Sequence, residues 1–226
     1  PFNIIPPNFG GAERCLNLLT RIGPVTTIAL NWDDGDQEGQ YKDMFYRLIS
    51  AEPEAKERSK KLFGQTVHTF DGMPAFCYKD LIKLKQAIDE EAPDLIILEH
   101  PRLVPFVGDV PFIYDAHNAE AFLTSIRWPG SVDEQVVKEL EKKAVENAKA
   151  ITYCSELDAD IFRKFYNVTV PMHYIPNGTD LPDKLAEGKT KNLVFIGSDY
   201  GPNVRAAQEL ADIAGLLPDY QIQILG

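Results

Sequence analysis

Short apolar segments alternate with longer amphipathic segments along most of the chain. The apolar segments are VTTIAL (25–30), DLIILEH (94–100), PFIYDAH (111–117), AITYCS (150–155), NLVFIG (192–197) and QIQILG (221–226). They do not alternate between apolar and polar positions, a pattern typical of strands buried on both faces of a parallel sheet. A further short apolar run, FNII (2–5), precedes the first of them.

The segments between these runs have the spacing of helices that pack on a sheet. In residues 78–92 one stripe holds Leu81, Leu84, Ile88 and Ala92, and in residues 131–150 another holds Val137, Leu140, Ala144 and Ala148. Ser131 and Glu134 form the spacing of a capping box at the start of the second helix. Strands alternating with helices predict an α/β fold, a doubly wound parallel sheet of six or more strands with helices on both faces.

One change of composition divides the chain. Residues 181–191, LPDKLAEGKTK, are polar and lack periodicity, so we interpret them as a linker between a Rossmann-like domain at 1–180 and a segment at 192–226. The second segment has only a strand, a helix and a strand. One face of such a unit stays uncovered, so we expect a truncated second Rossmann-like domain.

Composition and charge limit the classes of protein to which this chain can belong. The net charge is -11, from 23 Lys and Arg against 34 Asp and Glu, and no basic cluster typical of nucleic-acid binding occurs. The three cysteines make no disulfide framework or CxxC pair, so we expect small core side chains in a reducing compartment. Without a signal peptide or a spanning apolar run of roughly 18 residues, the sequence predicts a cytoplasmic protein.

A glycine pair lies early in the chain, in PPNFGGAERCLNLL (6–19). Gly10 and Gly11 have no Cβ, so a ligand can approach the main chain there, and the N–H groups of the helix that follows favour a phosphate. A plain turn is the alternative interpretation. A similar strand–loop–helix occurs at GSDYGPN (197–203), with Arg205 behind it, but neither a GxGxxG nor a P-loop motif is present.

Polar residues follow two of the predicted strands, at the sheet edge where α/β proteins bind ligands. Glu99 and His100 follow one strand, whereas His117, Asn118 and Glu120 follow the next. A histidine bonded to backbone is the common alternative for each, but two at neighbouring strand ends favour a functional site. We interpret His68 and His173 as structural.

No metal site is predicted, and several enzyme classes lack their motifs. The acidic turn DDGD (33–36) matches no calcium loop and is best explained as a solvated turn, while DAD (158–160) suits the start of a helix. Motifs of the form GxSxG or HExxH are missing as well, so serine hydrolases and metalloproteases receive no support.

Taken in order, these segments resemble a known family. PPNFGGAERCLNLL, PDLIILEHPRLVPF, PFIYDAHNAE, ITYCSELDADIF, YIPNGTD and NLVFIGSDYGPNVRAA are similar to motifs of the retaining, nucleotide-sugar-dependent glycosyltransferases with two Rossmann-like domains, the GT-B architecture of family four. The resemblance is weakest at 31–75. It implies a hexosyltransferase-like enzyme of carbohydrate biosynthesis that needs no cofactor or metal.

The resemblance also assigns roles to residues. It implies that His117 lies near the transferred sugar and acts in catalysis. Glu99, His100, Asn118 and Glu120 would line the acceptor side. The donor side would hold Gly10, Gly11, Ala12, Gly197, Ser198, Asn203 and Arg205.

Two departures and two alternatives accompany this interpretation. The family's Arg and Lys phosphate contacts have no convincing match, and its Glu-x7-Glu element would lie beyond residue 226, so we expect the chain alone to be inactive. A non-catalytic α/β module that binds a sugar or nucleotide is the main alternative, and a Rossmann oxidoreductase is disfavoured without GxGxxG. The acceptor stays open, whether carbohydrate, lipid-linked or other, and so does peripheral membrane contact.

Overall fold

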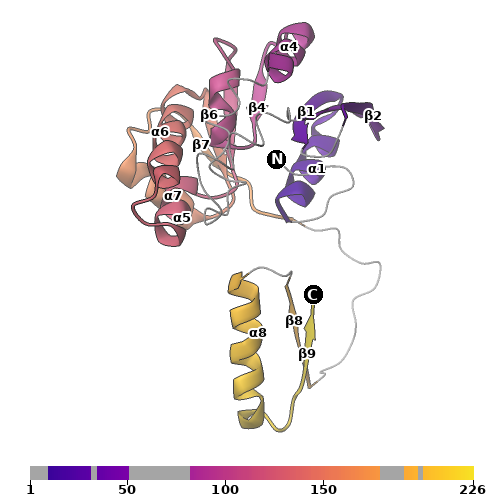
Figure 1. Cartoon of the computed structure of the whole chain (residues 1–226), viewed down its shortest axis with the longest axis vertical. Helices are drawn as coiled ribbons and strands as arrows, with labels where there is room; N and C mark the ends of the chain where they lie inside the picture. The colour runs from indigo at the N-terminus through magenta and orange to yellow at the C-terminus, as the bar shows by residue number, and fades with distance from the viewer. Residues whose placement is uncertain (1–9, 32–34, 51–81, 179–190, 198–200) are drawn as a thin grey trace. The chain divides into compact units, whose positions relative to one another are not determined.

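The computed structural model describes residues 10–31, 35–50, 82–178, 191–197 and 201–226. The chain divides into two compact units, Pro1–Gly178 and Thr179–Gly226 (Figure 1). No helix in these ranges is both long and apolar enough to cross a membrane. FNII (2–5), His68, Cys77, Ser198 and most of the predicted linker lie outside the described residues.

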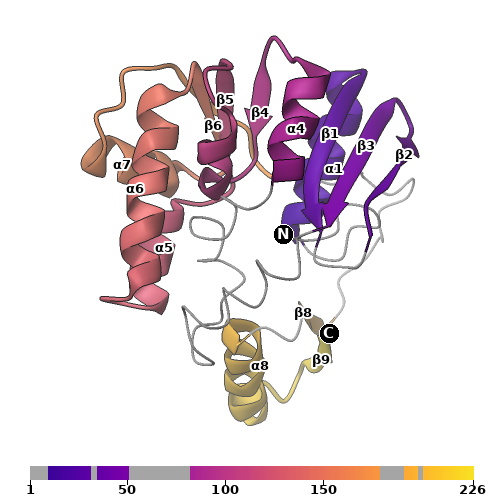
Figure 2. The same ribbon diagram turned by 45° about the horizontal axis from the view of Figure 1, so that its top comes forward.

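The larger sheet of the first unit is fully parallel. Its strands run in the order β4 (Ile96–Leu98), β5 (Phe112–Ala116), β6 (Ala150–Tyr153) and β7 (Met172–Tyr174). The connections between them hold η2 (Pro101–Phe106), α5 (Glu120–Arg127), α6 (Val132–Asn147) and α7 (Glu156–Phe165) (Figure 2). This is the α/β architecture predicted from the alternating pattern.

The helices that pack on this sheet bury the apolar stripes predicted from their sequences. The predicted face of α6 is buried as expected, and Val137 and Ala144 are both 0 % exposed. On the sheet, Tyr114 and Ile151 are also 0 % exposed, and the Tyr114 ring packs against Phe162 of α7 with ring centroids 6.2 Å apart. Burial of these side chains supplies the main favourable term for this half of the unit.

A second sheet has helices on both faces. It consists of β1 (Val25–Asn31), β2 (Gln37–Tyr41) and β3 (Met44–Ser50), with α1 (Gly10–Ile22) and α4 (Ile82–Glu91) as its helices (Figure 2). Neighbouring residues of β1 point to opposite faces. Leu30 packs with Leu84 of α4, whereas Ala29 packs with Leu16 and Cys15 of α1.

The structure differs from four of the expectations stated above. The described strands of the first unit form two sheets instead of one, and β2 pairs with β3 in antiparallel fashion because a tight turn joins them. In α4, Leu84 and Ile88 pack into the core as predicted, but Ala92 lies past the helix end with φ +44° and is exposed. Cys154 is only half-buried, not a core residue.

The second unit is a small parallel pair with one helix. It consists of β8 (Asn192–Ile196), α8 (Gly201–Ile213), η3 (Ala214–Leu216) and β9 (Gln221–Leu225), with β8 and β9 parallel. Neither helix of this unit contains a buried residue, and Val194 and Leu225 are about half exposed.

Candidate active site

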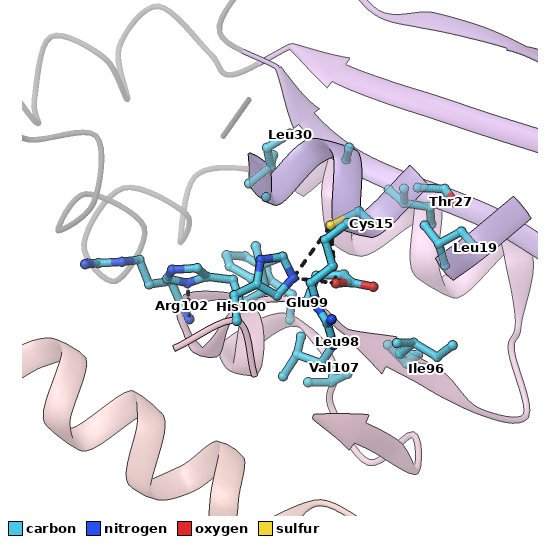
Figure 3. Close-up of a pocket in the computed structure, with 18 of the residues that line it drawn as sticks. Cys15, Leu19, Thr27, Leu30, Ile96, Leu98, Glu99, His100, Arg102 and Val107 are labelled. Atoms are coloured by element: carbon cyan, nitrogen blue, oxygen red, sulfur yellow. Dashed lines mark hydrogen bonds and ion pairs between the residues drawn. The ribbon is translucent and has the colours of Figure 1, made fainter. Parts of the chain in front are cut away.

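A cavity of about 940 Å³ opens in the first unit where several elements meet. Its walls come from the start of α1, from β1 and β4, and from the residues that follow β4 and β5 (Figure 3). Most of the residues predicted for the first unit's site line it, namely Gly10, Gly11, Glu99, His100, His117, Asn118 and Glu120. The structure therefore brings both predicted strand ends and the glycine loop to one cavity.

Three side chains from different elements meet at the centre of the site. His117 Nε2 lies 2.9 Å from Glu99 Oε2, and the thiol of Cys15 donates to the same carboxylate oxygen at 3.3 Å. Cys15 Sγ also lies 3.7 Å from His117 Nε2. Cys15 is 0 % exposed on α1, in a cluster that sequence reasoning treated only as core.

Glu99 is the acidic centre of this cluster. Burial raises the pKa of its carboxyl group above the usual range, and His117 opposes that rise by hydrogen bonding. Its second oxygen, Oε1, is buried and has no hydrogen-bond partner among the described residues. A buried carboxylate oxygen without a partner is costly, so it marks a position where a ligand can bind.

The remaining polar groups of the two strand ends contact one another. His100 Nδ1 accepts from the Arg102 amide at 3.3 Å and so caps η2, which is the structural role foreseen as its alternative. Burial lowers the pKa of His100 well below its usual value, so the ring stays neutral. Asn118 Nδ2 donates to Glu120 Oε1 at 2.9 Å.

A buried ion pair that was not predicted from the sequence lies next to this cluster. Arg14 of α1 contacts both oxygens of Asp115 on β5, at 3.2 and 2.8 Å. The same guanidinium donates to the carbonyl of Ile175 at 2.9 Å and to Asn177 at 3.1 Å. The available signal was the charge of Asp115 inside an apolar strand, which implies a buried partner.

A second missed group holds the start of α5, directly after Asn118. Glu141 of α6 is 0 % exposed and accepts from the amides of Glu120 and Ala121 at 2.6 and 3.1 Å. Asp158 accepts from the amide of Ala119 at 2.8 Å, a contact beyond the helix-start preference expected for it. Glu141 could have been noticed because it falls on the apolar stripe of α6.

Of the three residues predicted to bind the donor at the glycine loop, Gly10 and Gly11 line the cavity and Ala12 does not. Gly10 begins α1 and lines the cavity, and a Cβ added there would have no heavy atom within 4 Å. Ala12, the third donor-side residue, is 0 % exposed and packs inside the unit, so its side chain does not line the cavity.

Of the donor-side residues predicted for the second unit, Gly197 directly follows β8, Asn203 and Arg205 lie in α8, and Ser198 lies outside the described residues. Gly197 donates its amide to Leu225 of β9 at 2.9 Å, and a Cβ on it would come within 3.0 Å of Asn203. Asn203 is half-buried and Arg205 is exposed, both on α8.

Comparison with known proteins agrees with this arrangement. The family model described as Glycosyltransferase Family 4 matches residues 25–182. The match includes both strand ends of the cavity but neither Gly10 and Gly11 nor residues 192–226. No curated protein matched the sequence. Because the matched range covers well over half of the 226 residues, the chain belongs to glycosyltransferase family 4.

Proposed function

We propose that this chain forms part of a retaining glycosyltransferase that transfers a hexose from a nucleotide-diphosphate sugar to an acceptor hydroxyl. The observation that carries the proposal is the placement of His117, Glu99 and the glycine pair on one cavity. In the transfer, the bond from the anomeric carbon to the diphosphate breaks and the diphosphate leaves with the electron pair. The acceptor oxygen bonds to the same face, and its proton passes to the departing diphosphate.

The start of α1 is the part of the cavity best suited to the diphosphate. Gly10 leaves its main chain open, and amides at a helix N-terminus favour an anion. The start of α5 also borders the cavity, but carboxylates of Glu141 and Asp158 bind its amides. A phosphate at α5 would meet amides that are already bonded within the protein, which supports α1 as the diphosphate site.

His117 would contact the sugar during transfer. It directly follows β5, so a rigid strand end places the ring on the cavity wall. Its Nε2 lies 2.9 Å from Glu99 Oε2, and in the tautomer with the proton on Nε2 this atom donates to the carboxylate and Nδ1 can accept a sugar hydroxyl. A hydrogen bond that strengthens as positive charge develops on the sugar accelerates the chemical step. No resident metal or cofactor takes part in this scheme, and the cytoplasm is the proposed location.

Because we expect the 226-residue chain alone to be inactive, the test uses the full-length protein that contains it, with a panel of UDP-, GDP- and ADP-sugars. We expect at least one donor to bind and be consumed, and His117→Ala to lower kcat/KM by about 10- to 1,000-fold while binding of the nucleotide alone is retained. His173→Ala is the matched control, because His173 is an exposed residue of β7. Binding of a donor without transfer would favour the non-catalytic module, and full activity of His117→Ala would contradict the role of the ring.

A further inference from the structure

The side chains of Cys15, Glu99 and His117 meet with their ligating atoms close together. One thiol sulfur, one carboxylate oxygen and one imidazole nitrogen all lie within 4.8 Å of one another. They come from α1, from the end of β4 and from the end of β5, so three separate elements aim them at one point. Thiolate, imidazole and carboxylate are the protein ligands that Zn²⁺ and similar divalent transition ions bind.

The distances between these atoms suit a single ion. Tetrahedral zinc with bonds of about 2.3 Å to sulfur and about 2.1 Å to nitrogen and oxygen requires ligand atoms about 3.4 to 3.6 Å apart. The observed separations are 3.3 Å for Cys15 Sγ to Glu99 Oε2, 3.7 Å for Cys15 Sγ to His117 Nε2 and 2.9 Å for His117 Nε2 to Glu99 Oε2. The His117–Glu99 separation is shorter than this range by about 0.5 Å, so metal binding requires these two side chains to rotate slightly apart.

The charge around the cluster also points to a cation. Asp115, the other buried carboxylate nearby, is neutralised by Arg14 at 2.8 Å. Glu99 has only His117 as an ion-pair partner among the described residues, and its Oε1 is buried without any hydrogen-bond partner. A thiolate and a carboxylate together balance a divalent ion, so the occupied cluster is neutral, which suits a buried position.

We propose that Cys15, Glu99 and His117 form a binding site for one divalent transition-metal ion of the zinc type, with the fourth coordination position facing the cavity. Binding releases the thiol proton of Cys15 and moves the imidazole proton of His117 from Nε2 to Nδ1, with no change in oxidation state. The ion bound at this site would take no part in the proposed transfer reaction. With the ion bound, His117 Nδ1 carries the proton and no longer accepts a sugar hydroxyl, so the ion competes with transfer.

Metal binding can be measured without any assay of transfer. A chain with Cys77→Ser and Cys154→Ser keeps Cys15 as its only thiol, because the sequence has three cysteines. Titrating the metal-free chain with Zn²⁺ in a calorimeter should give one ion per chain. Co²⁺ should give a sulfur-to-metal charge-transfer band, which requires a thiolate ligand and is independent of stability.

Variants of single ligands test the composition of the site. In the same background, Cys15→Ser and His117→Gln should each weaken Zn²⁺ binding by at least about 100-fold, since removal of outer partners alone costs 10- to 100-fold. His173→Gln, on an exposed strand position, is the matched control and should bind like the parent. Absence of saturable binding, absence of the charge-transfer band, or undiminished binding by Cys15→Ser would each overturn the proposal.

Inhibition gives a second readout that rests on the proposed function. In the full-length protein used for the transfer test, Zn²⁺ at saturating concentration should abolish transfer, and a chelator should restore it. Metal binding without inhibition would show that the ion and the sugar do not compete, which overturns the competition but not the site. Absence of Zn²⁺ binding to the chain would overturn the metal site but would leave the proposed transferase function untouched.

Discussion

Arg14 and Asp115 form a two-point ion pair between α1 and β5, with contacts of 3.2 and 2.8 Å and side chains only 4 % and 3 % exposed. The hydroxyl of Thr152 on β6 donates to the same carboxylate. Asp115 lies two residues before His117, and Arg14 lies next to Cys15. The pair therefore fixes the two elements that carry the centre of the candidate site against each other.

We predict that Arg14→Met destabilises the protein strongly. It leaves the buried Asp115 carboxylate without a cation, and loss of one partner of a buried pair typically costs about 3–5 kcal/mol. Urea unfolding followed by circular dichroism measures the change. The surface variant Arg47→Ala, which breaks contacts with Glu90 and Glu91, is the control and should cost about 1 kcal/mol or less.

The coupling between the two residues can be isolated. In the double variant Arg14→Met/Asp115→Asn, the loss of unfolding free energy should be clearly smaller than the sum of the losses in the two single variants, because no unpaired charge remains. Additive costs would mean that the pair contributes no mutual stabilisation.

Glu141 should make stability depend on pH. Burial raises its pKa from 4.5 to about 7, despite hydrogen bonds from Tyr166 and two amides that lower it. The folded state thus holds a proton that the unfolded state has released between about pH 4.5 and 7. The contribution of Glu141 to stability is then greatest below pH 4.5 and falls as pH rises toward 7, by about 3 kcal/mol in total.

Comparison with Glu141→Gln measures this effect. The unfolding free energy of the wild type minus that of Glu141→Gln should decrease between pH 5 and pH 8. Glu139→Gln, at an exposed position of the same helix, should show a constant difference. A difference that grows with pH for Glu141→Gln would mean that its pKa is not raised.

The N-cap half of the capping box predicted at the start of α6 is confirmed, whereas the reciprocal bond of Glu134 goes to the Gly130 amide, because the Ser131 amide donates to Trp128. Ser131 Oγ accepts from the Glu134 amide at 3.1 Å, and Glu134 accepts from the Gly130 amide at 2.6 Å. We predict that Ser131→Ala costs about 1 kcal/mol of unfolding free energy, and that Ser131→Asp restores most of it. Equal stability of all three proteins in urea would contradict the cap.

Gly10→Ala should separate folding from ligand binding. A Cβ at Gly10 meets no heavy atom within 4 Å, so the variant should be as stable as the wild type or up to about 1 kcal/mol more stable. If the donor diphosphate lies against this main chain, the same Cβ should weaken donor binding by at least about tenfold. Calorimetry with the nucleotide sugar measures the binding, and unchanged affinity would exclude close contact at Gly10.

The amino-acid sequence by itself determined the local features. Apolar runs located β4, β5, β6 and β8, and their ends located Glu99 and His117, because parallel strands end at one sheet edge. The stripe of α6 and its cap at Ser131 were also readable, since helical periodicity and capping depend on neighbours within one turn.

The tertiary structure alone decided which distant residues meet. Arg14 and Asp115 are 101 residues apart, and Cys15 and Glu99 are 84 apart, so no periodicity connects them. Periodicity shows which face of an element is buried but not what lies opposite. For the same reason the sequence predicts no more than a core residue at Cys15. Only packing of α1 beside the ends of β4 and β5 placed its sulfur next to a carboxylate and an imidazole.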